Sequence, residues 1–215
     1  DGLLLEENSH IYLYEAGAAA ALSGLTCHLL PGKSGVFTAG TVENAIRQSD
    51  VHFPRSRLLS LENTSNRGGG TVWPMEQIDS VCQVARDNDM RLHLDGARLW
   101  NATAVTGIPE SEYSSQFDSV SVCFSKGLGA PVGSILAGDE ELIQRARHIR
   151  KQFGGGMRQV GIIAAGALFA LEHHRQRLVD DHHNAHKLAA GISSISGLQV
   201  DTASVSTNMV YFDVM

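Results

Sequence analysis

The stretch Ser119-Val-Ser-Val-Cys-Phe-Ser-Lys-Gly-Leu-Gly-Ala-Pro-Val-Gly133 joins a buried-strand pattern to a glycine-rich turn. Val120, Val122 and Phe124 supply the apolar side chains of the strand, and Lys126 follows at its carboxyl end. An amine held at the mouth of an apolar strand loses hydration, which lowers its pKa and makes it nucleophilic. From this stretch alone, an ordinary lysine at a strand-to-loop junction remains the alternative.

A second stretch, Arg91-Leu-His-Leu-Asp-Gly-Ala-Arg98, has the pattern of a short strand that ends in a carboxylate. Nucleophilic lysines commonly bind the carbonyl carbon of pyridoxal phosphate, and this cofactor requires a carboxylate against its pyridine nitrogen. Asp95 meets that requirement, although Asp is also favoured as the cap of a following helix. One helix, one connection and one strand separate Asp95 from Lys126. Because the carboxyl ends of parallel strands line a common crevice, this spacing favours a pyridoxal phosphate site.

Strand and helix patterns alternate along most of the chain. Strand patterns occur at residues 3–5, 26–30, 58–61, 91–95 and 134–137, in addition to the strand before Lys126. Helix patterns occur at residues 16–22, 41–47, 74–89, 98–106 and 140–152, and a long one at 159–195 is expected to break near 172–174. Repeated strand–helix units predict an α/β domain with a mainly parallel sheet.

The composition is that of an ordinary globular protein. The 215 residues are 43% hydrophobic and 19% charged, and the net charge of −6 argues against a nucleic-acid surface. No apolar run reaches the length of a membrane span. The cysteines number three, an odd count that favours a reducing compartment, so we expect a cytoplasmic protein and leave a mitochondrial location open. Both ends of the chain lie in strand-like segments, so we expect a fragment.

Several long motifs occur in the order in which a known family carries them. They are Ser9-His-Ile-Tyr-Leu-Tyr-Glu-Ala-Gly17, Val51-His-Phe-Pro-Arg55, Leu61-Glu-Asn-Thr64, His93-Leu-Asp-Gly-Ala-Arg98, Ser125-Lys-Gly-Leu-Gly-Ala-Pro-Val-Gly133, Gly154-Gly-Gly-Met-Arg-Gln159 and Thr207-Asn-Met209. With these motifs the chain resembles the L-threonine aldolases, of the low-specificity or L-allo type. These are pyridoxal phosphate enzymes with the aspartate-aminotransferase fold, known as fold type I.

The resemblance implies the organisation and the activity. Residues 1–186 would form the large cofactor-binding domain without its N-terminal portion, and residues 187–215 would begin a truncated small C-terminal domain. The expected reaction is cleavage of L-threonine or L-allo-threonine to glycine and an aldehyde. The expected partners are a small amino-acid substrate and further copies of the chain, as a dimer of dimers, with neither nucleic acid nor membrane.

The resemblance also assigns three charged residues. Lys126 corresponds to the lysine that binds the cofactor covalently, and Asp95 to the partner of the pyridine nitrogen. Arg98 corresponds to the arginine that grips the substrate carboxylate, for which the planar guanidinium is suited. A surface ion pair in the first turn of a helix is the alternative for Arg98.

Two histidines and a tyrosine match site residues of the family. His10 corresponds to the histidine that stacks on the cofactor ring, and a histidine that binds backbone at a strand end is the alternative. His52 is a candidate base for the β-hydroxyl proton, since a neutral imidazole suits that task. A plain loop histidine before Pro54 is the alternative for His52. Tyr14 is expected to face the substrate side chain.

The remaining assignments concern the cofactor phosphate and the rim of the site. Arg158 follows three glycines and is expected near the phosphate, in the same or a neighbouring subunit, whereas a flexible hinge is the alternative. Ser125 either binds a phosphate oxygen or only ends its strand. Glu62 and its two neighbours are expected to support the site. Ser65 departs from the family, which commonly has histidine there.

Two other functional interpretations were considered. The five histidines between residues 173 and 186 lack the cysteine or carboxylate partners of a zinc site, so we expect no metal and a solvated helix surface. Another fold-type-I lyase that performs β-elimination, or a homologue without activity, remains an alternative to the aldolase.

Overall fold

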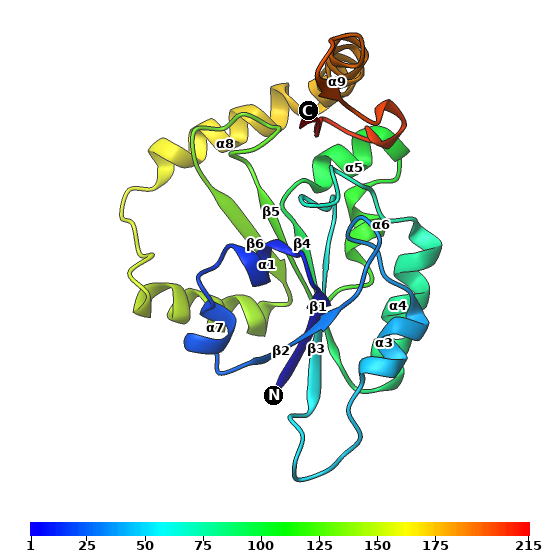
Figure 1. Ribbon diagram of the computed structural model, residues 1–215. Helices are drawn as coiled ribbons and strands as arrows, with labels where there is room; N and C mark the ends of the chain where they lie inside the picture. Colours follow the sequence, from blue (N-terminus) through cyan, green and yellow to red (C-terminus); the bar gives the residue numbers. More distant parts are fainter.

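The computed structural model describes all residues from 1 to 215, and a six-stranded sheet forms its centre (Figure 1). The strands of this sheet are β1 (Gly2–Glu6), β2 (Thr26–Leu30), β3 (Ser56–Glu62), β4 (Arg91–Gly96), β5 (Ser119–Cys123) and β6 (Ser134–Gly138). Their spatial order is β2-β1-β3-β4-β5-β6. Five strands are parallel, and only the edge strand β6 runs antiparallel to its neighbour β5.

The helices lie on both sides of this sheet and above it (Figure 1). They are α1 (His10–Leu13), α2 (Ala18–Ala21), α3 (Ala39–Ala45), α4 (Met75–Asp87), α5 (Leu99–Thr106), α6 (Glu110–Ser114), α7 (Glu140–Gln152), α8 (Gly161–His173), the 3-10 turn η1 (Arg175–Arg177) and α9 (Leu178–Ser193). A second 3-10 turn, η2 (Thr202–Ser204), and a two-stranded sheet of β7 (Leu198–Gln199) and β8 (Asp213–Val214) follow α9.

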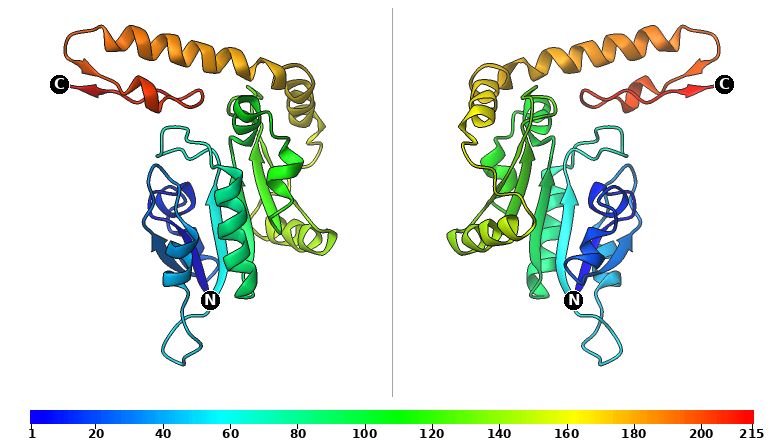
Figure 2. Two further views of the ribbon diagram at one scale, coloured as in Figure 1. Left: turned by 90° about the vertical axis from the view of Figure 1, so that its right-hand side faces the viewer. Right: turned by 90° about the vertical axis from the view of Figure 1, so that its left-hand side faces the viewer.

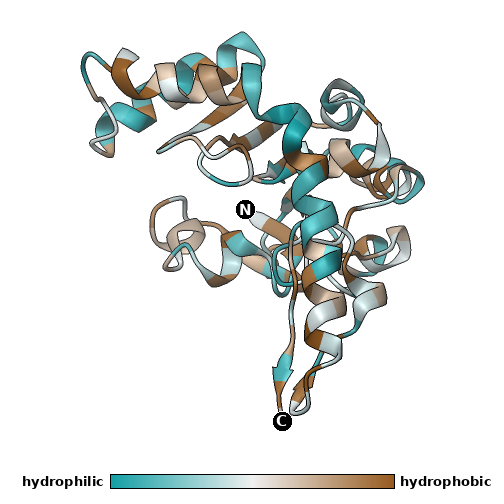
Figure 3. Cartoon of the chain, turned by 90° about the horizontal axis from the view of Figure 1, so that it is seen from above, coloured by the Kyte–Doolittle hydropathy of each residue, from teal (hydrophilic) through white to brown (hydrophobic).

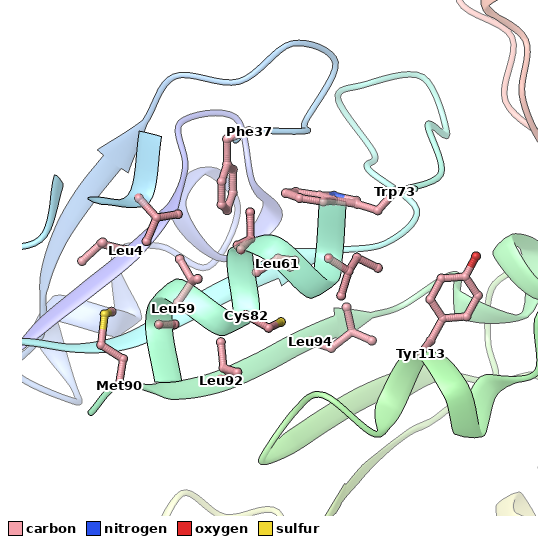
Figure 4. Packing of buried hydrophobic residues seen from close by; sticks show 14 of the residues in the cluster. Leu4, Phe37, Leu59, Leu61, Trp73, Cys82, Met90, Leu92, Leu94 and Tyr113 are labelled. Atoms are coloured by element: carbon pink, nitrogen blue, oxygen red, sulfur yellow. The ribbon is translucent and has the colours of Figure 1, made fainter. Parts of the chain in front are cut away.

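The main hydrophobic core fills the space between one face of the sheet and helices α3, α4 and α5 (Figure 4). Alternate residues of β3 and β4 point into it because side chains of a strand alternate between its two faces. The apolar stripe of α4 that the sequence predicts is fully buried, and consists of Ile78, Val81, Cys82 and Ala85. Phe37 and Trp73 close the core with ring centroids 4.9 Å apart in a T-shaped arrangement.

The structure confirms the α/β class with a mainly parallel sheet. The predicted strand at residues 26–30 and the predicted helix at 140–152 have the predicted bounds, and the long helical stretch breaks after His173 into α8 and α9. The short helices α1 and α6 were not expected. They contain four and five residues, too few for a hydrophobic period to emerge.

Helix α9 extends across the top of the molecule, and the C-terminal segment returns beneath it (Figure 2). Seen from above, α9 carries both hydrophilic and hydrophobic residues along its length (Figure 3). Its buried residues include Ala185 and Ala189, which pack against Val205 of the returning segment. The domain boundary expected after residue 186 falls inside α9. None of the helices combines the length and the apolar character that a membrane crossing requires.

The returning segment contacts the glycine-rich loop that follows β3. The Thr207 hydroxyl donates a hydrogen bond to the Gly70 carbonyl (2.9 Å), and the Tyr211 hydroxyl donates one to the Asn66 carbonyl (3.0 Å). Gly70 has a φ of +82°, and a Cβ at this position would collide with the Thr207 hydroxyl. Glycine is therefore required here both for the backbone conformation and for the contact.

We expect Gly70→Ala to destabilise the chain more than Gly107→Ala. Both glycines have a positive φ, so each alanine costs about 1–2 kcal/mol. No atom lies within 4 Å of the Cβ that Gly107→Ala would add, whereas Gly70→Ala also overpacks the contact with Thr207, at about 1–3 kcal/mol more. Urea unfolding of both variants measures the difference, and equal losses would contradict the contact.

Candidate functional site

Asp95 lies at the carboxyl end of β4, in register with Glu62 of β3 and Ser121 of β5. Asp95 is only 7% exposed, and its Oδ1 accepts a hydrogen bond from the Ala97 N–H (3.1 Å). Asp95 takes part in none of the ion pairs of the chain. A buried carboxylate without a cation is unfavourable, so this position suits a positively charged ligand group.

Lys126 follows β5 in a turn that packs firmly on the helices behind it. The Gly129 N–H closes the turn by donating to the Lys126 carbonyl (2.8 Å), and Leu128 is fully buried against α8 and α9. The Lys126 side chain is half-buried and takes part in none of the ion pairs. The backbone of this lysine is thus fixed while its amine has no anionic partner in the chain.

Two residues that the sequence did not single out support the lysine turn. A Cβ at Gly127 would lie 3.0 Å from Oδ1 of Asn101 in α5, which is closer than an ordinary contact, and the His174 ring nitrogen Nδ1 lies 2.7 Å from the Leu128 carbonyl oxygen. These contacts join residues far apart in the sequence, so no local sequence pattern predicts them. They attach the turn to both α5 and the end of α8.

Arg98 precedes α5 directly and is half-buried, three residues after Asp95. Its guanidinium takes part in none of the ion pairs of the chain, unlike Arg86, Arg91 and Arg175. The predicted alternative, a surface ion pair, is therefore not formed. A half-buried arginine without an ion-pair partner, three residues from Asp95, can instead accept an anionic ligand.

His10 begins α1, beyond the carboxyl end of β1. Its Nε2 lies 2.8 Å from the Glu15 carboxylate, and its ring lies 5.4 Å from the ring of Tyr14. The backbone N–H of His10 donates to the carboxylate of Glu62 at 2.6 Å. The histidine, the tyrosine and the β3 end are thus gathered at the same edge of the sheet as Asp95, and the pairing with Glu15 is a feature that the sequence analysis missed.

Glu62 itself is buried, with 8% of its surface exposed. One carboxylate oxygen accepts from His10, and the other accepts from the Asn66 N–H at 2.7 Å. Burial raises the pKa of the Glu62 carboxyl above its usual range, the two N–H donors oppose that rise, and the charge of Asp95 adds to it. The expectation that Glu62 supports the site therefore has a structural basis in these two hydrogen bonds.

Three predicted site residues make no hydrogen bond or ion pair with Asp95, Glu62 or His10. His52 lies in the loop between α3 and β3, at the amino end of the sheet and opposite Asp95, where its Nδ1 is 2.7 Å from Asp50 (Figure 1). Arg158 is exposed in the segment between α7 and α8, apart from β4. Ser125 is exposed, and its hydroxyl is 3.5 Å from the Gly133 carbonyl oxygen.

The expectation that the histidines of α9 form a solvated surface is wrong for His182. This residue is 5% exposed, and its Nε2 lies 3.0 Å from the amide nitrogen of Asn101. Burial lowers the pKa of His182 below its usual range. His183 and His186 are exposed, as expected. No group of three or more histidine, cysteine or acidic side chains is arranged to hold a metal ion.

Comparisons with known proteins agree with the architecture and with the resemblance noted in the sequence. A low-specificity L-threonine aldolase of Candida albicans is 40% identical over 218 residues, which cover 99% of this chain and 56% of that protein. The chain spans about 60% of the length of the curated relatives it matches. The resemblance to the threonine aldolases is thereby confirmed.

Solved structures show the same fold. A threonine aldolase from Leishmania major superposes with a TM-score of 0.80 at 20% identity, covering 95% of this chain and 60% of that one. An aspartate aminotransferase from Thermus thermophilus superposes with a TM-score of 0.71 at 14% identity, covering 98% of this chain and 54% of that one. The predicted fold type I is thus confirmed. The sequence model of the protein family described as beta-eliminating lyase matches residues 1–215. The chain therefore belongs to the beta-eliminating lyase family.

Proposed function

We propose that the protein cleaves L-threonine or L-allo-threonine to glycine and acetaldehyde with the help of pyridoxal phosphate. The observation that carries this proposal is a buried anion without a cation, Asp95, at the carboxyl end of β4, together with two half-buried cations without anions, Arg98 after β4 and Lys126 after the neighbouring strand β5. Relatives named threonine aldolases support the choice of substrate.

The residues present fit the cofactor. Asp95 would face the pyridine nitrogen and keep it protonated, which satisfies its buried charge. The Lys126 amine would bind the cofactor carbonyl covalently, and the rigid turn would hold it in place. Pyridoxal phosphate, when bound, supplies a ring that accepts the electron pair of a breaking bond. Arg158 and Ser125 are proposed to contact its phosphate, with Arg158 acting within an assembly of several copies.

Arg98 would bind the substrate carboxylate with two parallel hydrogen bonds and so fix the orientation of the amino acid. His10 would stack on the cofactor ring, and Tyr14 would face the substrate side chain. A base takes the β-hydroxyl proton as the Cα–Cβ bond breaks, directly or through water. His10 is favoured for this role because it lies at the carboxyl edge. His52 would serve as a base only for a site on a neighbouring copy, since it lies at the opposite edge.

Three broader features complete the proposal. Residues 1–186 belong to the large cofactor-binding domain and residues 187–215 begin the small domain, with α9 shared by both. The protein forms a homo-oligomer, a dimer of dimers. Its three cysteines are unpaired, which supports a cytoplasmic or mitochondrial location.

The first experiment is borohydride reduction after incubation with pyridoxal phosphate, followed by peptide mass mapping. We expect a pyridoxyl group on Lys126 and none in Lys126→Ala. Lys33→Ala is the matched control, since Lys33 is an exposed lysine after the carboxyl end of β2 and should leave the label unchanged. A label that persists in Lys126→Ala would contradict the assignment. A product assay then separates aldol cleavage, which gives glycine, from β-elimination, which gives pyruvate and ammonia.

Asp95→Asn should reduce threonine cleavage far more than cofactor binding. Without the carboxylate the pyridine nitrogen would not stay protonated, so the ring would accept the electron pair less readily, while the bond to Lys126 would still hold the cofactor. If a charge pair of about 4 kcal/mol, at about 4 Å and an effective dielectric near 20, is lost from the transition state, the rate falls roughly a thousandfold. Steady-state kinetics with saturating cofactor gives kcat, and fluorescence titration gives the cofactor Kd. Equal losses in both quantities would argue against the role of Asp95 as partner of the pyridine nitrogen.

Arg98→Lys should raise KM for threonine by about 10- to 100-fold, because an ammonium group cannot bind a carboxylate in two places. Arg67→Lys is the matched control: Arg67 is exposed in the loop after β3, and its replacement should leave KM unchanged. The measurement is initial cleavage rate against threonine concentration. An unchanged KM in Arg98→Lys would remove Arg98 from the substrate site.

A further inference from the structure

Glu62 is a buried carboxylate whose two oxygens each accept one backbone N–H. The His10 N–H donates to Oε2 at 2.6 Å, and the Asn66 N–H donates to Oε1 at 2.7 Å. The two donors lie on different segments, one after β1 and one after β3. The Glu62 side chain therefore connects the segment after β1 with the loop after β3 at the carboxyl edge of the sheet.

The backbone N–H of His10 has no acceptor other than Glu62, while its carbonyl accepts the Tyr14 N–H at 2.9 Å. Helix α1 has four residues and none of them is buried. The residue before it, Ser9, makes no capping hydrogen bond with its side chain. The first N–H groups of a helix lack partners within the helix, and a carboxylate near them is favourable. Glu62 supplies this acceptor from a strand that is rigidly held in the sheet.

The second donor connects Glu62 to the C-terminal segment. The Asn66 carbonyl accepts from the Tyr211 hydroxyl, and Gly70 of the same loop accepts from Thr207. Figure 2 shows the C-terminal segment beside this loop. The series of contacts thus runs from His10 through Glu62 and the loop to the segment beneath α9.

We propose that Glu62 is a positioning residue, which holds His10 in place for the ring of the cofactor and ties it to the loop after β3. This inference rests on the proposed function for the role of His10, whereas the two hydrogen bonds can be tested without it. The role requires two acceptor oxygens in one side chain. Glutamine has nearly the same shape but only one acceptor, so it can serve one of the two N–H groups.

The test is amide hydrogen exchange by NMR on the chain without cofactor. In the natural protein the His10 N–H should exchange at least tenfold more slowly than the N–H of Ile11, which has no acceptor in α1. In Glu62→Gln, the His10 or the Asn66 N–H should lose at least tenfold of its protection. Glu6→Gln is the matched control, because Glu6 is a buried carboxylate on the adjacent strand that binds Asn8 instead.

Unchanged protection of both N–H groups in Glu62→Gln would overturn the proposal. If that variant does not fold, the comparison of His10 with Ile11 in the natural protein still decides, since equal exchange of the two would show that Glu62 does not hold His10. If the natural protein forms no cofactor adduct at Lys126, the proposed function fails while the amide result stands.

The link to the cofactor is tested with a double-mutant cycle. The visible circular dichroism of the bound cofactor and its Kd should change in His10→Ala and in Glu62→Gln, and the double variant should resemble His10→Ala alone. The effect of Glu6→Gln should add to that of His10→Ala. Additive effects of Glu62→Gln and His10→Ala would mean that Glu62 acts through the general structure and would overturn its role through His10.

Discussion

Burial of negative charge at one edge of a parallel sheet is the constraint on which the rest of the site depends. Glu6, Glu62 and Asp95 lie at the carboxyl ends of three strands of the sheet, and all three are buried. Each must be satisfied without an ion pair, since none of them takes part in one. Glu6 and Glu62 are satisfied by N–H groups of the chain, and Asp95 receives a single one. Asp95 is thus the least satisfied of the three carboxylates, which is the reason for proposing that it faces a cationic ligand group.

The positively charged Lys126 is positioned in a different way. Lys126 stands in a turn that is anchored from behind by Asn101 and His174, and the buried Leu128 supplies the apolar contact. The amine thus needs no partner to have a defined backbone position. Asp95, Lys126 and Arg98 accordingly form no ion pair with one another.

The sequence predicts the fold well where the chain carries a period. The buried stripe of α4 and the strand that ends at Asp95 are recognisable because apolar residues recur at helical or strand spacing. The direction of β6 is not, since an apolar strand has the same pattern whether it pairs parallel or antiparallel. Asp95, Lys126 and Arg98 could be predicted as site residues because each lies at or after the end of such a strand and belongs to a recognised motif.

The parts of the site that the sequence did not predict depend on contacts between distant residues. Glu62 and His10 are 52 residues apart, and Asn101 and His182 are 81 apart. His182 was assigned to a solvated surface because a helix with many histidines is usually exposed, and burial of one of them depends on a partner in α5. The placement of His52 at the amino edge likewise follows from the path of the chain between α3 and β3, which no local pattern encodes.

The contact between Thr207 and Gly70 joins residues 137 positions apart. Closing a loop of that length costs about 4 kcal/mol of chain entropy, and this cost is met before the contact contributes any stability. Local strand–helix units gain their contacts over much shorter separations and so can form earlier. During synthesis the loop after β3 leaves the ribosome long before its partner does. The contact between the loop after β3 and the C-terminal segment therefore forms late during folding, after the strands beneath it have assembled.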